Sequence, residues 1–103
     1  MVSLEELKEE VKEFRDVRDW RRYHTPKDLA VSISIEASEL LELFQWKHQS
    51  LKGLDKEELS DEMADVLIYL LSLSEVTDID LGKAVRDKLE KNRKKYPPDQ
   101  EHF

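Results

Sequence analysis

The sequence predicts an all-α protein whose protomer resembles a four-helix bundle. Charged residues make up 40% of the chain, whereas only two glycines and three prolines occur in 103 residues. Such a composition favours helices, because a β fold needs many more turn residues. Apolar residues also recur at helical spacing in several segments separated by short breaks. A chain of this length buries one modest core, so residues 1–103 are expected to form a single domain.

The first half of the chain contains two helix start signals. Ser3 and Glu6 resemble a capping box, and the helix that follows is expected to reach about Val17. Its apolar positions are Leu4, Leu7, Val11 and Phe14. Thr25, followed by a proline, is typical of an N-cap and a first helical residue, and the helical pattern continues to about His48.

The second half of the chain contains two more helices. After a short break, Asp55 provides the next N-cap, for a helix that reaches roughly Glu75. Asp80 caps the fourth helix, which must end near Tyr96 because two prolines follow. From about residue 97 onward we expect a short polar tail.

The third predicted helix is nearly apolar on all sides from Val66 to Leu71, whereas the fourth has few apolar residues. A helix without a polar face lies at the centre of a larger core. We therefore expect a homo-oligomer, in which other copies supply the missing cover. The same run is the longest apolar segment and is far shorter than the roughly 20 residues that span a bilayer, so a soluble, cytoplasmic protein is expected.

Charge and composition narrow the possible functions. The chain has 24 acidic and 17 basic residues and a formal net charge of -7, so its field repels polyanions and a nucleic-acid polymer is not an expected partner. A ligand that carries phosphates would need a bound divalent cation or a local basic cluster. The absence of cysteine excludes disulfides, thiolate zinc sites and thiol nucleophiles.

Two pairs of carboxylates occupy positions where apolar residues are expected. On the second helix, Glu36 falls near the middle of an apolar stripe, and Glu39 lies one turn further along the same flank. On the third helix, Glu62 borders an apolar stripe and Asp65 follows one turn later. The two stripes consist of Leu29, Ile33, Leu40 and Leu43, and of Leu59, Met63, Val66, Leu70 and Leu73. Antiparallel packing of these helices would bring the four carboxylates face to face.

Four carboxylates in one partly dry cleft need a cation or a proton. Two like charges about 4 Å apart repel by about 4 kcal/mol at an effective dielectric constant near 20. An all-oxygen site without cysteine or a histidine pair suits a hard ion, of which Mg2+ matches phosphate substrates best, and disfavours zinc. The alternative interpretation is that the pairs are ordinary solvated charges, as expected for residues 5–13, because 24 acids produce such spacings by chance.

Longer motifs surround the two acidic pairs. They are Arg18-Asp19-Trp20, Tyr23-His24-Thr25-Pro26, Glu36 to Trp46, Glu62 to Leu70, Lys88, and Asn92-Arg93 with Tyr96-Pro97. In this order and at these separations they resemble the MazG-like family of all-α nucleoside triphosphate pyrophosphohydrolases, and in particular its dCTP pyrophosphatase branch. Relatives often have valine and glycine where this chain has Ala37 and Ser38, which changes the local packing but not the carboxylates.

The resemblance implies hydrolysis of a (deoxy)nucleoside triphosphate to the monophosphate and pyrophosphate, as nucleotide-pool housekeeping, with dCTP or a modified pyrimidine nucleotide as the expected substrate. It implies Mg2+ as the cofactor, held by Glu36, Glu39, Glu62 and Asp65. Glu39, ahead of Glu36, is the first candidate for activating the attacking water. Members of the family assemble as homodimers or homotetramers with sites near subunit interfaces, so Trp20 could serve a neighbour's pocket.

Two groups of side chains are candidates for substrate binding. The first group combines flat rings with polar tips that suit a nucleobase: Trp20, His24, Trp46 and Tyr69. Alternatively, the two tryptophans merely close the core at helix ends. The second group lies on the fourth helix, and the resemblance places most of it close to the phosphates: Lys88, Asn92, Arg93 and Tyr96. Its alternative interpretation is an ordinary cationic helix C-terminus, which the helix dipole favours.

Two other classes of function compete with the enzyme. A helical regulatory module could bind a nucleotide or a partner helix without chemistry, although the intact acidic pairs argue against it. An oxidative di-iron bundle would need Glu-x-x-His pairs, and none of the three histidines follows a glutamate at that spacing. A P-loop is excluded, because Gly53 and Gly82 are the only glycines.

Overall fold

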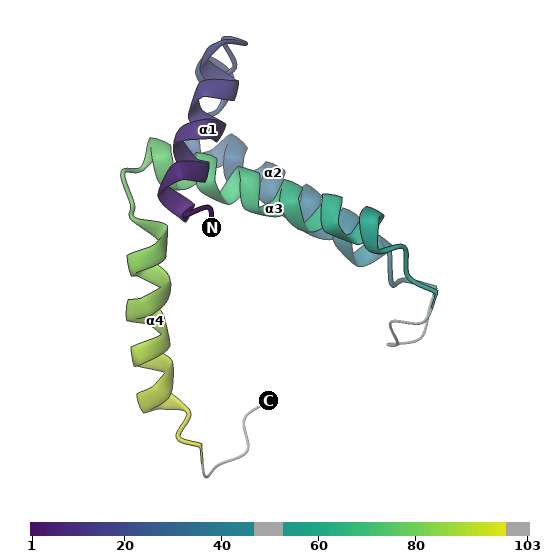
Figure 1. Ribbon diagram of the computed structural model, residues 1–103, viewed down its shortest axis with the longest axis vertical. Coiled ribbons are helices and arrows are strands. Elements are labelled where there is room, and N and C mark those ends of the chain that lie inside the picture. The colour runs from purple at the N-terminus through teal and green to yellow at the C-terminus, as the bar shows by residue number, and fades with distance from the viewer. Residues whose placement is uncertain (47–52, 99–103) are drawn as a thin grey trace.

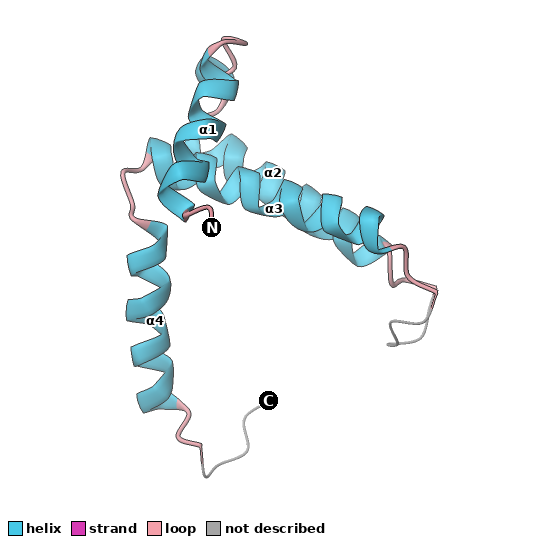
Figure 2. Cartoon of the chain, in the orientation of Figure 1, coloured by secondary structure: helices cyan, strands magenta, loops and turns pink. Residues whose placement is uncertain are grey.

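The computed structural model describes residues 1–46 and 53–98 (Figure 2). Within these ranges it contains the α-helices α1 (Leu4–Asp16), α2 (Pro26–Glu42), α3 (Lys56–Val76) and α4 (Leu81–Lys95), and a short 3₁₀ helix, η1 (Arg21–Tyr23), between α1 and α2. No strand occurs in the described part of the chain. The predicted all-α class is therefore confirmed.

Each α-helix begins at the residue that the sequence predicts. The side-chain oxygens of Ser3 and Thr25 each accept a hydrogen bond of 3.1 Å from the backbone N–H group three residues ahead. Asp55 accepts two bonds, from the N–H group two residues ahead at 3.0 Å and from that three residues ahead at 3.2 Å, and Asp80 accepts one from three residues ahead at 3.0 Å. These bonds satisfy N–H groups that have no partner inside the helix. Local sequence alone therefore decides where the helices start.

The end of α2 corrects the prediction. α2 ends at Glu42 rather than near His48. The backbone N–H groups of residues 43–45 donate to carbonyls three residues back, at 3.3, 2.9 and 3.3 Å, and these tighter bonds end the α-helix in a series of turns. His48 itself, most of the predicted loop and the end of the predicted tail lie outside the described residues.

α3 is the central helix, as its apolar run predicts. It lies antiparallel to α2 along most of its length, and α1 packs across its C-terminal half (Figure 1). The apolar side chains that are buried most completely are Leu29 of α2, at 0% exposed, and Leu71 of α3, at 2%. The small core therefore lies between α2 and α3, near the C-terminal half of α3 against which α1 packs.

α4 departs from the expected four-helix-bundle-like arrangement. It projects away from the other helices and makes only sparse contacts with them (Figure 1). Asp78 ends α3 with a φ of 54°, and Ile79 donates its backbone N–H to the carbonyl of Ser74 at 2.9 Å. Because α4 has few apolar residues, little holds it against α3 after this turn. Within one chain the bundle therefore consists of α1, α2 and α3.

The chain is correspondingly extended. Its Cα radius of gyration is 16.4 Å, compared with about 13 Å for a compact domain of this length. Apolar side chains on α2 and α4 remain exposed, including Ile35 at 52%, Val85 at 50% and Leu89 at 46%. A single chain therefore leaves apolar faces of both helices uncovered.

Candidate metal centre and adjoining cavity

Three carboxylates from two helices meet where α2 and α3 lie side by side. Glu36 comes from α2, and Glu62 and Asp65 come from α3. Each offers one carboxylate oxygen, and these oxygens all lie within 4.8 Å of one another. All three side chains are partly buried, because they border or interrupt the apolar contact between the two helices. We call these three residues the acid cluster.

Glu39, the fourth predicted ligand, lies beside the acid cluster. It follows Glu36 by about one turn of α2, so the two side chains share a flank of the helix. The carboxyl groups of Glu39 and Glu36 are close enough to share a hydrogen bond, and the charge of Glu39 also acts on Glu62. Glu39 therefore belongs to the same electrostatic unit without joining the close group of three oxygens.

Burial and mutual repulsion oppose full ionisation of the acid cluster. Burial is the largest cause that raises the pKa of Glu36 from 4.5 to about 7, followed by the hydrogen bond and charge of Glu39 and then by the charges of Asp65 and Glu62. Burial is also the main cause that raises the pKa of Glu62, followed by the charges of Glu39 and Asp65. Carboxyl groups that resist ionisation in the free protein are stabilised as carboxylates by a bound cation.

The oxygen atoms of the acid cluster fit a hard divalent cation. Oε2 of Glu36 and Oε2 of Glu62 are buried, and neither has a hydrogen-bond partner within residues 1–46 and 53–98. Buried acceptors without a partner are uncommon in proteins and call for an explanation such as a bound ion. The donor set consists of carboxylate oxygens, which suits Mg2+ better than zinc.

A cavity of about 470 Å³ adjoins the acid cluster between α1 and α3, and we call it the α1–α3 cavity. Asp65 of the acid cluster is one of its lining residues, so the cavity borders the cluster at this carboxylate. Phe14, Trp20, His24 and Tyr69 line it as well. The ring centroids are 5.6 Å apart for Phe14 and Trp20, 6.2 Å for Trp20 and His24, and 6.3 Å for His24 and Tyr69. These contacts form one continuous aromatic wall.

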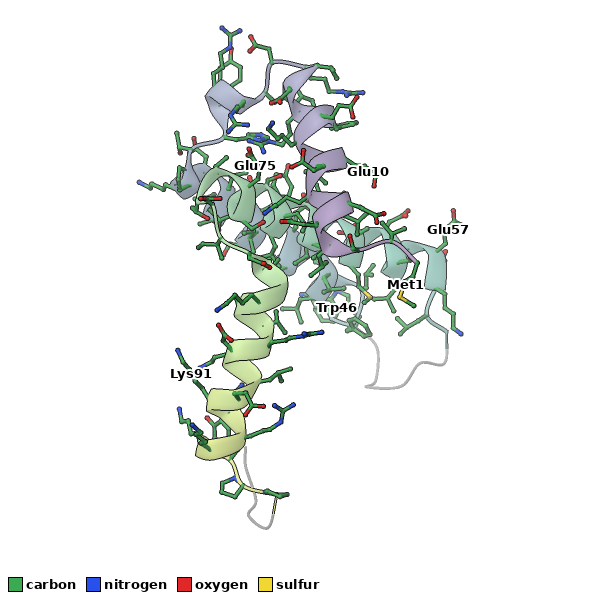
Figure 3. The ribbon with its side chains drawn as sticks, turned by 60° about the vertical axis from the view of Figure 1, so that its left-hand side comes forward. Met1, Glu10, Trp46, Glu57, Glu75 and Lys91 are labelled. Carbon is green, nitrogen blue, oxygen red and sulfur yellow. The ribbon has the colours of Figure 1, made fainter. Side chains whose placement is uncertain are left out.

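A buried arginine forms hydrogen bonds with the aromatic wall and with α3. Arg15 is only 2% exposed and also lines the α1–α3 cavity. Its Nε donates to Nδ1 of His24 at 3.1 Å, and its Nη1 donates to Oε2 of Glu75 at 3.3 Å. Oε1 of Glu75 accepts a second hydrogen bond, of 2.9 Å, from Nη1 of Arg21. Figure 3 shows Glu75 at the end of α3 that lies near α1, where it links α1, η1 and α3.

The turn after α1 explains why Trp20 reaches the cavity. Asp19 has a φ of 54°, and Trp20 donates its backbone N–H to the carbonyl of Arg15 at 3.0 Å. This arrangement ends the helix with a left-handed residue and turns the chain back. The ring of Trp20 consequently packs edge-on against Phe14.

The sequence interpretation missed Phe14 as a cavity residue and missed Arg15 and Glu75 altogether. A signal for the charged pair was present: Arg15 follows Val11 by four residues, and Glu75 follows Leu71 by four. Both charges therefore continue apolar stripes, on helices that turn out to pack together. Opposite charges in the apolar stripes of two helices indicate a buried ion pair, but only once the pairing of the helices is known.

Other predicted site residues lie apart from the acid cluster within one chain. Trp46 follows α2, is 88% exposed and does not line the α1–α3 cavity (Figure 3). The four predicted phosphate-binding residues lie on or directly after α4, which projects away from α2 and α3 (Figure 1): Lys88, Asn92, Arg93 and Tyr96. Lys88 and Asn92 share a groove of about 350 Å³ on α4 with Val85.

Comparison with known proteins decides the family. Residues 31–103, which include the acid cluster and Glu39, match the model of the MazG-like family. This chain belongs to the MazG-like family. The family resemblance seen in the sequence is thus confirmed. No helix of the MazG-like chain, within residues 1–46 and 53–98, has the length and apolar character that a membrane span requires.

Individual members of the MazG-like family extend the comparison. The chain is 38% identical over 101 residues to dCTP pyrophosphatase 1 of Rattus norvegicus and to that of Homo sapiens, and in both cases the match covers 92% of this chain. It spans 59% of the length of each of these relatives. The crystal structure of a pyrophosphatase from Archaeoglobus fulgidus is 52% identical, with a TM-score of 0.85 and a match that covers 94% of both chains.

Proposed function

We propose that this protein hydrolyses a (deoxy)nucleoside triphosphate to the monophosphate and pyrophosphate with the help of Mg2+. One observation supports the proposal most strongly: the acid cluster has two buried carboxylate oxygens without a hydrogen-bond partner among the described residues, and through Asp65 it borders a cavity lined by aromatic rings. Carboxylates that coordinate a divalent cation allow the phosphates to bind, and flat aromatic rings stack on a nucleobase. Both requirements of a nucleotide are met in adjoining places.

The size of the cavity and the similar proteins support the same function. A volume of about 470 Å³ falls within the range of roughly 300–1,000 Å³ that is usual for small-molecule sites. The curated relatives are named dCTP pyrophosphatases, and the similar crystal structure is that of a pyrophosphatase. We therefore propose dCTP or a modified pyrimidine nucleotide as the preferred substrate and nucleotide-pool housekeeping as the role.

In this proposal the acid cluster, with Glu39 beside it, holds Mg2+ when the ion is bound. When bound there, the ion would neutralise charge on the phosphate oxygens, so that a polyanion could approach an acidic protein. Glu39, which stands outside the close group of three oxygens, is the carboxylate best able to accept a proton from the attacking water, with Glu36 as the alternative. Trp20, His24 and Tyr69 would hold the base.

We also propose that the working enzyme is a homodimer or homotetramer. The exposed apolar residues of α2 and α4 favour a second copy as cover. α4 stands away from the acid cluster of its own chain, so Lys88, Asn92, Arg93 and Tyr96 would serve the phosphates only across a subunit interface. Measurement of the mass in solution by light scattering tests this arrangement, and a stable monomer with full activity would contradict it.

The central test is a substrate panel. The protein is incubated with each common deoxynucleoside triphosphate and with modified pyrimidine triphosphates, in MgCl2 or in EDTA, and the products are separated by ion-exchange chromatography. We expect equal amounts of monophosphate and pyrophosphate, and only with the metal. Release of single phosphates, or equal turnover in EDTA, would contradict the proposal.

Matched variants separate chemistry from folding. Asp65→Asn removes one carboxylate of the acid cluster and should abolish turnover, whereas Asp61→Asn changes an exposed carboxylate on the same helix and should retain it. Circular dichroism should show unchanged helix content in both variants. Nucleotide binding without turnover of any triphosphate by the unaltered protein would instead favour the non-catalytic regulatory module.

A further inference from the structure

We infer that Arg15 is a positioning residue that holds His24 in the tautomer with its proton on Nε2, so that His24 offers a fixed hydrogen-bond donor to the nucleobase in the α1–α3 cavity. The inference concerns residues outside the acid cluster. It rests on the proposed function for the identity of the ligand, whereas the tautomer itself follows from the geometry of the free protein.

The tautomer follows from the chemistry of the two side chains. Nε of Arg15 lies 3.1 Å from Nδ1 of His24. A guanidinium group remains protonated in proteins and has no acceptor, so Nδ1 must be the acceptor in this hydrogen bond. A neutral imidazole with an unprotonated Nδ1 carries its proton on Nε2. A protonated imidazole would instead turn an N–H group toward the arginine.

Arg15 can impose this choice because its own side chain is fixed. It is 2% exposed, and its Nη1 donates to Oε2 of Glu75 at 3.3 Å. Glu75 is held in turn by Nη1 of Arg21 at 2.9 Å, and Arg21 also lies 3.8 Å from the carboxylate of Asp16. Partners on α3 and η1 therefore set the direction of the guanidinium plane before any ligand arrives.

The Nε2–H group of His24 is in a position to donate a hydrogen bond to a ligand. Its ring lies between those of Trp20 and Tyr69 and lines the same cavity as Asp65 of the acid cluster. Among residues 1–46 and 53–98, no protein atom forms a hydrogen bond with its Nε2. A base that stacks against the aromatic wall could satisfy this donor with a carbonyl oxygen or a ring nitrogen.

Burial and the charge of Arg15 favour the neutral form of His24. Burial lowers the pKa of His24, and the positive charge of Arg15 on α1 lowers it further, while Asp28 on α2 opposes both. From α3, Tyr69 faces the ring, and Glu75 pairs with Arg15 rather than with His24. His24 is thus a neutral donor for an acceptor atom and not a cation for a phosphate.

The first experiment detects the tautomer without substrate. The protein is labelled with 15N-histidine and studied by NMR at pH 7, and His48→Gln and His102→Gln variants assign the signals. We expect His24 to show an unprotonated Nδ1 and a protonated Nε2. Arg15→Met should convert this signal to a mixture of tautomers. A proton on Nδ1, or a mixture in the unaltered protein, overturns the inference even if the Arg15 variant does not fold.

The second experiment tests the donor with a matched pair of variants. The side-chain amide nitrogen of His24→Gln can occupy the place of Nε2, whereas His24→Asn is too short to do so. With dCTP and Mg2+, we expect KM to rise at least about tenfold for His24→Asn and less than about threefold for His24→Gln, with kcat similar in both. Equal KM values for the two variants, or an effect on kcat alone, overturn the proposed donor role.

The two experiments also distinguish failure of the inference from failure of the proposed function. If the unaltered protein hydrolyses no triphosphate, the hydrolase proposal fails, and the dissociation constants of dCTP with Mg2+, measured by calorimetry, replace KM in the same comparison. If dCTP does not bind at all, the donor role toward a nucleobase is overturned. The NMR measurement on the free protein determines the tautomer of His24 whatever the substrate assays show.

Discussion

Replacement of Glu36 by glutamine should stabilise the metal-free protein above pH 7 and remove its stabilisation by Mg2+. In the folded protein the pKa of Glu36 is about 7, above its ordinary value of 4.5. Between these values the folded state keeps a proton that the unfolded state has lost, so the free energy of unfolding falls as the pH rises. Glutamine does not titrate, so the benefit of the substitution is absent below about pH 4.5 and complete above about pH 7.

The structure sets the size of the expected effect. The difference of about 2.5 between the two values corresponds to at most about 3 kcal/mol, at about 1.36 kcal/mol for each pKa unit. Glu36 is partly exposed, and solvent screening reduces the expected gain to about 1–2 kcal/mol. For a domain of this size about 1 kcal/mol changes Tm by about 4–8 °C, so Tm should rise by at least about 4 °C at pH 8.

Thermal melts followed by circular dichroism test this prediction, at about pH 4 and at pH 8, with EDTA or with MgCl2. The unaltered protein should gain stability from Mg2+ at pH 8, and Glu36→Gln should gain little. Glu42→Gln, an exposed carboxylate at the end of α2, serves as the control and should change stability by less than about 0.5 kcal/mol. The reasoning is refuted if Glu36→Gln has the same Tm as the control in EDTA at pH 8, or if it keeps the full response to Mg2+.

Three further predictions concern stability. Leu29→Ala should lower the free energy of unfolding in urea by about 2–5 kcal/mol, because Leu29 is fully buried, whereas Leu29→Met should cost less than about 1.5 kcal/mol. Asp80→Ala should cost about 0.5–2 kcal/mol through loss of the α4 cap, and Asp80→Asn should restore most of this in the same urea titration. Glu75→Gln should cost about 3–5 kcal/mol, because the buried charge of Arg15 loses its partner. A Tm of Glu75→Gln equal to that of the unaltered protein would contradict a buried ion pair.

The parts of the fold that local chemistry controls were predictable. The caps at Ser3, Thr25, Asp55 and Asp80 need only a side-chain oxygen and N–H groups two or three residues away. The position of Glu36 at a contact between helices was predictable for a related reason. A carboxylate inside an apolar stripe must lie at a helix contact, whichever helix is the partner.

The parts that depend on distant partners were not predictable. Arg15 and Glu75 are 60 residues apart, and each alone resembles a surface charge at a helix end. The end of α2 was placed too late, because periodicity continues to Phe44 although the backbone bonds have already tightened. The direction of α4 depends on a turn at Asp78, a residue type with no strong preference for a left-handed conformation.

The sequence by itself determined the all-α class, the helix starts, the central place of α3 and two pairs of carboxylates within or beside apolar stripes. Only the tertiary structure decided that Glu36, Glu62 and Asp65 meet while Glu39 stands beside them, that Arg15 bonds to His24, and that α4 leaves the bundle. The physical reason is range. Capping and periodicity act within about one or two turns of a helix. The position of a buried charge, by contrast, depends on which helices, far apart in the sequence, pack against one another.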